Sequence, residues 1–262
     1  MKYDHYTKGA DWRRRLHVWS QLSLFQKLLR RMEFESALEI GPGHGEFASF
    51  CRQRQVRYKA VEEHPAIASA LARQGYDVIV SDIGTLTQHL GTFDLIVMSH
   101  VLEHLGSYHD AARALKSLMA MLKPAGHIVL LFPDVQWSPA PFYNDYTHTF
   151  PTTIRAVRTL CEDIGGSCVR VGHYVGPWLR PWKLIWLVHR IMPTWILPHT
   201  WGAELDSMLM INAYCIARVS NRQSFAQARS QCEASQHAAV PRSRANQPET
   251  ERGRVPEAID VQ

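Results

Sequence analysis

The chain has 262 residues, of which 46% are hydrophobic and 20% charged, and its formal net charge is +5. This composition is that of an ordinary globular protein, with enough residues for one sizeable core. Much of the positive excess lies in Arg13, Arg14 and Arg15 and in the C-terminal tail, so it indicates a solvated face rather than a nucleic-acid partner. The five cysteines form no C-x-x-C pair and the N-terminus lacks the apolar core of a signal peptide. We therefore expect a cytoplasmic protein with free thiols.

In chain order, short apolar runs alternate with helical patterns. After a helical pattern at 12–32, strands are expected at 36–40, 57–62, 77–80, 93–98 and 126–132, with helices near 45–54, 64–74, 107–122 and 151–164. Pro124 and Gly126 are expected to end a helix before the buried strand that follows. The runs at 168–175 and 208–219 predict a closing antiparallel hairpin. Together they predict an α/β fold: a doubly wound, mostly parallel seven-stranded sheet with the last strand antiparallel.

Composition divides the chain into three parts. Residues 1–34 are an N-terminal helical segment, 35–220 are the main domain, and 221–262 have the sparse apolar content of a disordered tail. The main domain carries a Trp-rich insertion at 176–207. Its first part, 176–201, holds five of the eight tryptophans but is interrupted by prolines and charges, which excludes a membrane-spanning helix. A lid, a dimer contact and a peripheral membrane contact all remain open for it.

Three glycines stand close together in ALEIGPGHGEF (37–47), just behind an apolar run. Such glycines suit a strand-turn-helix cradle, because they allow positive φ and the close approach of a ligand. The spacing is G-x-G-x-G, which differs from the dinucleotide fingerprint G-x-G-x-x-G, and no Lys-Ser or Lys-Thr closes a phosphate-binding loop. The glycines alone also allow a turn without a ligand.

The order of motifs then resembles a known family. ALEIGPGHGEF is followed by YKAVEEH (58–64), VSDIGTL (80–86), FDLIVMSHVLEHL (93–105) and LKPAGHIVLLFPD (122–134), as in the class I S-adenosylmethionine-dependent methyltransferases. The resemblance covers roughly 35–175 and reaches about 219 through the final strand. It implies a Rossmann-like methyltransferase fold with S-adenosylmethionine as cofactor, and residues 1–34 as a cover over the cofactor site.

The resemblance assigns a cofactor site to the ends of four strands. Because side chains alternate along a strand, only one of the two neighbouring acids can face the ligand. The family pattern, an acid directly after the apolar residue, implies that Glu62 takes the ribose hydroxyls and that Glu63 faces away. Asp82 would bond the adenine amino group, although a turn-forming role ahead of Gly84 is the alternative. The expected cofactor residues are Glu39 at the ligand's ammonium group, Gly41, Gly43 and Gly45 along its backbone path, Glu62, Asp82, Ile83 on the adenine ring, and Ser99 and His100 after the fourth strand.

The acceptor side is less defined. SHVLEHL (99–105) resembles a subgroup that includes ubiquinone-biosynthesis and sugar or glycan O-methyltransferases, in which a D-x-x-H-x-x-x-F element follows the fifth strand. Here YNDYTHTF offers Asp145 and His148, with Phe150 only two positions later. Methyl transfer to a hydroxyl needs alignment and removal of its proton, so His104, His148 and Asp145 are the catalytic candidates. The alternative for both histidines is structural.

A metal site is the other interpretation of the same residues. His100, Glu103 and His104 would share a face of a helical turn, and His148 could complete a site. Some relatives bind a divalent ion with an E-x-x-E-H element, but His100 replaces the first acid here and removes a hard oxygen ligand. We therefore predict no metal.

These features favour an O-methyltransferase acting on a small molecule, a glycan or a lipid-linked intermediate. A non-catalytic S-adenosylmethionine-binding or scaffold protein of the same fold is the alternative. Nucleic-acid methylation is less favoured, because no N-P-P-Y element follows the fourth strand and the basic residues do not form an aromatic-interleaved groove. The sequence leaves the oligomeric state open.

Overall fold

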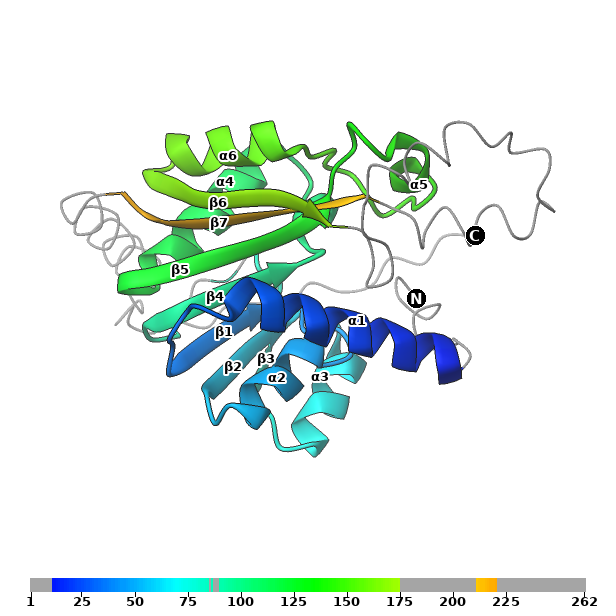
Figure 1. The fold of residues 1–262 in the computed structure, drawn as a ribbon, viewed down its shortest axis with the longest axis vertical. Helices are drawn as coiled ribbons and strands as arrows, with labels where there is room; N and C mark the ends of the chain where they lie inside the picture. The colour runs from blue at the N-terminus through cyan, green and yellow to red at the C-terminus, as the bar shows by residue number, and fades with distance from the viewer. Residues whose placement is uncertain (1–10, 85, 87–89, 175–210, 221–262) are drawn as a thin grey trace, which may run out of the picture.

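The computed structural model describes residues 11–84, 86, 90–174 and 211–220 (Figure 1). Its strands are β1 Ser36–Ile40, β2 Arg57–Glu62, β3 Val78–Val80, β4 Phe93–Ser99, β5 Leu122–Pro133, β6 Gly166–Tyr174 and β7 Asn212–Val219. Its helices are α1 Asp11–Leu29, α2 Glu46–Gln53, α3 Pro65–Arg73, the 3-10 turn η2 Leu102–His104, α4 Tyr108–Ala120, α5 Pro139–Tyr143 and α6 Ile154–Asp163. The Trp-rich insertion at 176–207 and the tail at 221–262 lie outside the described residues.

One seven-stranded sheet, in the order β3-β2-β1-β4-β5-β7-β6, organises the fold. The pairs from β3 through β5 are parallel, whereas β7 runs antiparallel to both β5 and β6. From β1 the chain moves outward through β2 and β3 and then returns to place β4 on the other side of β1. This reversal is a topological switch point, and open α/β sheets bind ligands there, at the carboxyl ends of their strands. The predicted fold class is confirmed.

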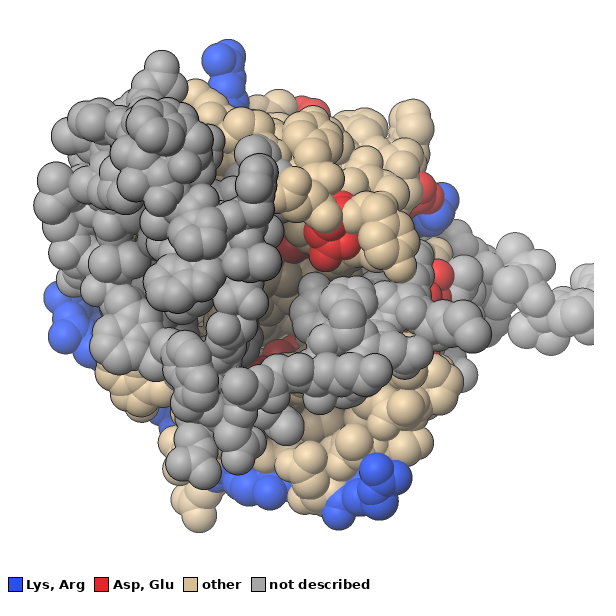
Figure 2. Space-filling view, turned by 90° about the vertical axis from the view of Figure 1, so that its right-hand side faces the viewer, with Lys and Arg blue, Asp and Glu red and all other residues tan. Residues whose placement is uncertain are grey.

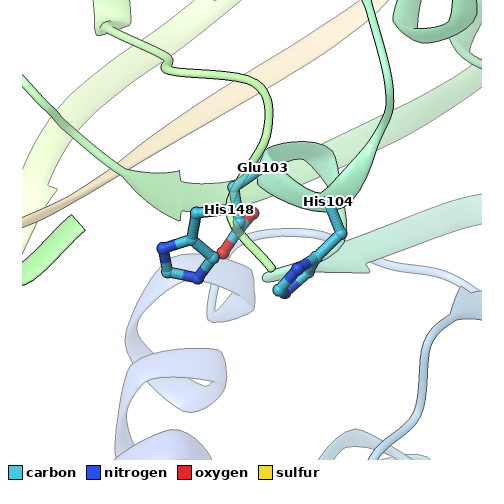
Figure 3. A group of neighbouring side chains, drawn as sticks. All are labelled: Glu103, His104 and His148. Carbon is cyan, nitrogen blue, oxygen red and sulfur yellow. The ribbon is translucent and has the colours of Figure 1, made fainter. Parts of the chain in front are cut away.

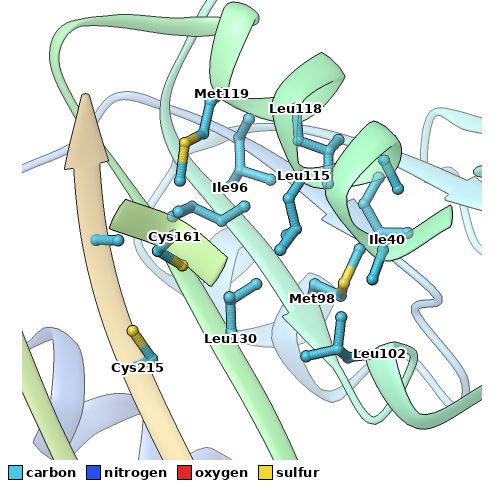
Figure 4. Packing of buried hydrophobic residues seen from close by; sticks show 14 of the residues in the cluster. Ile40, Ile96, Met98, Leu102, Leu115, Leu118, Met119, Leu130, Cys161 and Cys215 are labelled. Carbon is cyan, nitrogen blue, oxygen red and sulfur yellow. The ribbon is translucent and has the colours of Figure 1, made fainter. Parts of the chain in front are cut away.

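Each face of the sheet has its own core. In β1, Leu38 and Ile40 point into a cluster under α4 and α6, and Figure 4 shows part of this packing. Ala37 points to the opposite face, where Phe25 of α1 packs against Phe47 of α2 at a ring-centroid distance of 5.0 Å. All five residues of β1 are buried because helices cover both faces, as expected for the centre of a parallel sheet. The N-terminal segment is thus fixed to the domain through α1.

The start of β5 differs from the prediction. Pro124 and Gly126 were expected to precede the strand, but β5 already begins at Leu122, directly after α4. The pairing with β4 shifts register between Phe93, which lies opposite Leu122, and Leu95, which lies opposite His127. The irregular register accommodates Pro124. A residue in a bulge need not donate a backbone hydrogen bond to the neighbouring strand, so the N–H that proline lacks is not required there. Proline therefore marks a bulge here and not a helix end.

The predicted hairpin between β6 and β7 is confirmed. Its last pair is Tyr174 with Asn212, so the chain leaves β6 and enters β7 at the edge where β4 and β5 end. Within the described part of the chain, no helix combines the length and apolar character needed to cross a bilayer.

Candidate active site

The carboxyl ends of the parallel strands meet at one edge of the sheet, which Figure 2 views face on. Among the described residues in this view, acidic side chains lie near the middle of the face as well as at its rim, whereas Lys and Arg lie at the rim. Three of the buried carboxylates, those of Glu39, Glu62 and Glu103, lie at the ends of β1 and β2 and after β4. Burial raises the pKa of Glu103, but its contacts with His100 and His104 make the net shift downward, so this carboxylate is ionised and favours a cationic ligand.

The turn after β1 has the backbone that its glycines predict. Gly41, Gly43 and Gly45 have φ angles of 68°, 52° and 84°, all in the left-handed region. A Cβ on Gly41 would collide with the side chain of Val101, and a Cβ on Gly45 would lie 2.7 Å from Cδ2 of Leu71. Apart from its chain neighbours, no atom of the described residues would lie within 4 Å of a Cβ on Gly43. The outer glycines thus serve packing, while Gly43 borders open space at the sheet edge.

Glu62 lies beside this turn. Its carboxylate accepts a hydrogen bond from the backbone N–H of His64 at 2.8 Å and another from the backbone of Gly43. Burial raises the pKa of Glu62, while these two hydrogen bonds act in the opposite direction. Glu62 is only 7% exposed, whereas Glu63 is exposed. The side-chain alternation along β2 therefore turns Glu62 inward, next to the turn.

Glu39 is in a different environment. It is 3% exposed and its carboxylate accepts a hydrogen bond from the hydroxyl of Tyr58 on β2. Burial raises the pKa of Glu39 to about 8, although the bond from Tyr58 lowers it. At neutral pH the protonated form therefore predominates. Its contact with a ligand's ammonium group stays a prediction.

Asp82 and Ile83 follow β3. One carboxylate oxygen of Asp82 accepts from the backbone N–H of Gly84 at 2.6 Å, which is the turn-forming bond given as the alternative above. The side chain of Asp82 is exposed. Ile83 is 9% exposed and packs in the hydrophobic cluster under α4 and α6. Their roles toward an adenine ring stay predictions.

His100 lies directly after β4 and contacts residues of η2 and β6. The preceding residue, Ser99, is half-buried and closes the strand opposite Leu131 of β5. His100 has a φ of 54°, unusual for a residue other than glycine. Its Nδ1 lies 3.0 Å from Glu103 Oε1 and its Nε2 lies 3.2 Å from the hydroxyl of Tyr174. Tyr174 was not among the residues predicted for the site, although it lies at the end of a predicted strand at this edge of the sheet.

Glu103, His104 and His148 form a cluster (Figure 3). One ligand atom from each lies within 4.8 Å of the others, and the rings of the two histidines are 4.9 Å apart. The segment carrying His148 is hydrogen-bonded to η2: the backbone N–H groups of Thr149 and Phe150 both donate to the carbonyl of Glu103. The structure thus brings together residues 44 positions apart, and it places His100 beside Glu103 rather than in the cluster.

Asp145 borders the cluster. One oxygen accepts from the backbone N–H and the hydroxyl of Thr147, at 2.9 and 2.6 Å, and the other lies 3.8 Å from Nε2 of His148. Partial burial raises its pKa, but the bonds from Thr147 outweigh this and the net shift is downward. Asp145 is therefore an anion that adds negative charge near His148.

A second acid-histidine pair was missed by sequence reasoning. Asp134, directly after β5 and 1% exposed, lies 2.8 Å from Nε2 of His173 on β6, and Trp137 packs edge-on against that histidine. Asp134 also accepts from the backbone N–H of Gln136. The sequence does contain a signal for this pair, because Asp134 is a charged residue directly after the buried strand β5.

Comparison with known proteins decides the family. A family model described as a methyltransferase domain matches residues 11–245. The chain belongs to this methyltransferase family. A comparison with curated proteins gives no match.

Solved structures agree with the fold of the methyltransferase. A SAM-dependent methyltransferase from Archaeoglobus fulgidus matches with 18% identity and a TM-score of 0.52, over 79% of this chain and 99% of that one. The N-methyltransferase NodS from Bradyrhizobium japonicum, solved with S-adenosyl-L-homocysteine, matches with 17% identity and a TM-score of 0.54, over 80% and 87%. The magnesium protoporphyrin IX methyltransferase of Synechocystis, solved with SAM, matches with 12% identity and a TM-score of 0.53, over 82% and 88%.

The cofactor of the methyltransferase is S-adenosylmethionine, as the sequence predicted. Its residues fit a ligand of this kind. Gly43 leaves room that a side chain would fill, and Glu62 presents a carboxylate, already oriented by two backbone N–H groups, at the end of the neighbouring strand. The acidic character of the edge suits the positive charges of the sulfonium and ammonium groups.

Proposed function

We propose that the methyltransferase transfers a methyl group to an acceptor hydroxyl at the Glu103, His104 and His148 cluster. The observation that supports this is a cluster of two half-buried imidazoles and one buried carboxylate next to the switch point. Glu103 and His104 follow β4, and His148 comes from the segment between α5 and α6. S-adenosylmethionine supplies the methyl group from its sulfonium. The protein must then hold the acceptor in line and remove its proton.

The hydrogen bonds of the two histidines prepare them for this task. Nδ1 of His104 lies 3.1 Å from the carbonyl of Thr147, and Nδ1 of His148 lies 2.9 Å from the carbonyl of Phe142. A carbonyl oxygen can only accept, so both Nδ1 atoms carry the proton. In the neutral imidazole the lone pair is then on Nε2, which is the atom that can take a proton from an acceptor.

The acceptor we infer is a small molecule, a glycan or a lipid-linked intermediate. The buried acidic centre of the edge disfavours the phosphate backbone of a nucleic acid. The inferred peripheral membrane contact through 176–201 is supported by sequence alone, since those residues lie outside the described part of the chain. A non-catalytic cofactor-binding protein would not require oriented histidines at this position.

The test is methyl transfer from labelled S-adenosylmethionine to fractionated cell extracts containing polar metabolites, glycans, lipids or RNA. We expect label in a non-nucleic-acid fraction, with mass spectrometry showing an O-methyl group. His104→Ala and His148→Ala should lower turnover by ~10²–10⁴-fold with nearly unchanged cofactor affinity, because a base acts on the way to the transition state.

His109→Ala is the matched control, since His109 is exposed on α4. Full activity in both cluster variants would contradict the base assignment. Tight cofactor binding without transfer to any fraction would favour the non-catalytic alternative, and label in RNA alone would overturn the acceptor class.

A further inference from the structure

Two thiols meet between β6 and β7. The Sγ atom of Cys168 lies 2.6 Å from the Sγ atom of Cys215, although the two residues are 47 positions apart in the chain. Non-bonded heavy atoms pack at about 3.5–4.0 Å, so this contact is closer than ordinary packing. Both residues are free cysteines, and neither belongs to the cofactor edge or to the proposed chemistry. The contact therefore needs another explanation.

A bulge in β6 produces the contact. Cys168 lies opposite Ala217 and Val171 lies opposite Cys215, with a register shift between Cys168 and Arg170. In a regular strand, residues three positions apart point to opposite faces. The extra residue of the bulge puts Cys168 on the same face as Val171, which is also the face of Cys215. Backbone pairing on both sides of the bulge thus keeps the two sulfur atoms together.

The two thiols differ in how far they can be reached from outside. Cys215 is fully buried in the cluster under α4 and α6, where Cys161 of α6 contacts it (Figure 4). Cys168 lies at the margin of this cluster and is half-buried. Burial raises the pKa of Cys168, although the contact with Cys215 and the charge of Arg158 act in the opposite direction. A small oxidant can therefore reach Cys168 first, and it reacts slowly there.

We propose that Cys168 and Cys215 form an intramolecular disulfide when the protein meets hydrogen peroxide. The thiolate of Cys168 attacks the O–O bond, so that one oxygen stays on the sulfur as a sulfenic acid and the other leaves as water. The thiol of Cys215 then attacks that sulfur, and the sulfenic hydroxyl leaves with the thiol proton as a second water. One peroxide is reduced and two thiols are oxidised. The closeness of Cys215 favours this second step over further oxidation of Cys168.

The sequence analysis expected free thiols because no two cysteines are close in the chain. A pair on neighbouring strands leaves no such signal, because the bulge and the strand register bring it together. The bond would link β6 to β7 across a separation that includes the Trp-rich insertion at 176–207. Closing a loop of this length restricts the unfolded chain, whereas the paired strands of the folded protein already hold the two residues side by side. We therefore expect the disulfide to stabilise the protein.

The experiment treats the full-length protein, first reduced and desalted, with hydrogen peroxide at mildly alkaline pH, where more thiolate is present. The intact mass under non-reducing conditions should fall by about 2 Da, the mass of the two hydrogens lost, and dithiothreitol should reverse the change. The oxidised monomer should melt at least ~5 °C higher than the reduced one. The measurement needs neither cofactor nor acceptor, so its result does not depend on the proposed function.

Peptide mapping identifies the pair. Glu162 lies between Cys161 and Cys168, so trypsin combined with a glutamate-specific protease puts these two cysteines on different peptides. We expect one cross-linked pair, containing Cys168 and Cys215. Cys168→Ser should show no loss of mass from a disulfide, whereas Cys232→Ser, the matched control outside the described residues, should behave as wild type.

Four results would overturn the proposal. They are an unchanged wild-type mass, a bond through any other cysteine, a cross-link between two chains, and oxidation of Cys168 to a sulfinic acid without a bond. An oxidised monomer that melts at a lower temperature than the reduced protein would also contradict it, because the bond would then form only by distorting the paired strands.

Discussion

Replacing Glu39 by glutamine should remove a pH-dependent loss of stability. Burial raises the pKa of this carboxyl from its ordinary 4.5 to about 8 in the folded protein. Between these values the folded protein keeps the proton that the unfolded chain releases. The stability of the wild type therefore falls as pH rises through this window, and it returns progressively as pH is lowered again, fully so below the unfolded value.

The size of the effect follows from the shift. One pKa unit corresponds to about 1.4 kcal/mol, so the free energy of unfolding of the wild type falls by about 5 kcal/mol between pH 4.5 and about 8. The glutamine variant does not titrate and does not show this decrease. Glutamine can still accept from the hydroxyl of Tyr58, but its amide N–H groups enter a buried place, which adds a cost that does not depend on pH. The test therefore depends on how the difference in unfolding free energy between wild type and Glu39→Gln changes with pH. The value of that difference at a single pH does not decide the question.

Urea unfolding of wild type and Glu39→Gln at several pH values from 4.5 to 8.5 provides the measurement. Relative to wild type, the variant should become more stable by about 1.4 kcal/mol per pH unit within the window. Glu63→Gln, at an exposed position directly after β2, serves as control and should follow the wild type. A stability difference that stays constant with pH would show that Glu39 is ionised in the folded protein and would refute the reasoning.

Three further substitutions test the turn and its acidic neighbour. Glu62→Ala should weaken S-adenosylmethionine binding by ~1–3 kcal/mol in calorimetry while Glu63→Ala leaves it unchanged; equal effects would mean that the wrong acid was assigned. Gly43→Val should fold but lose measurable cofactor binding, because the new side chain fills the open space beside the turn; unchanged affinity would remove the turn from the cofactor site. Gly41→Ala should instead lower the melting temperature, since its Cβ collides with Val101 at a positive φ, and a wild-type melting temperature would contradict this packing.

The strands β1 (SALEI) and β2 (RYKAVE) could be predicted because each carries short apolar stretches that end at a glycine turn or a pair of acids. The expected ranges 36–40 and 57–62 coincide with β1 and β2. The start of β5 was predicted wrongly because Pro124 was taken as a helix terminator, whereas the bulge opposite Phe93 tolerates it. Local sequence cannot distinguish these two uses of proline, because the difference lies in how the partner strand pairs.

The site was predictable where it follows a strand and not where it depends on a loop. Side-chain alternation indicated that only one of Glu62 and Glu63 faces inward, the family pattern favoured Glu62, and the structure buries Glu62. The position of His148 could not be derived, because it depends on backbone bonds between its loop and the carbonyl of Glu103, which no periodicity encodes. The hydrogen bond from the Tyr58 hydroxyl on β2 to Glu39 on β1 is equally non-local.

The pairing of Tyr174 with Asn212 has a consequence for how this protein can change over evolution. The intervening residues leave and re-enter the sheet at adjacent, hydrogen-bonded positions, so their ends stay at a fixed spacing whatever their number. Long loops closed in this way cost little additional free energy as they lengthen. Substituting the whole segment with one from a relative would thus leave the sheet register and the cofactor edge intact. The sheet therefore separates what the cofactor requires of the strand ends from a stretch of chain whose length can change independently.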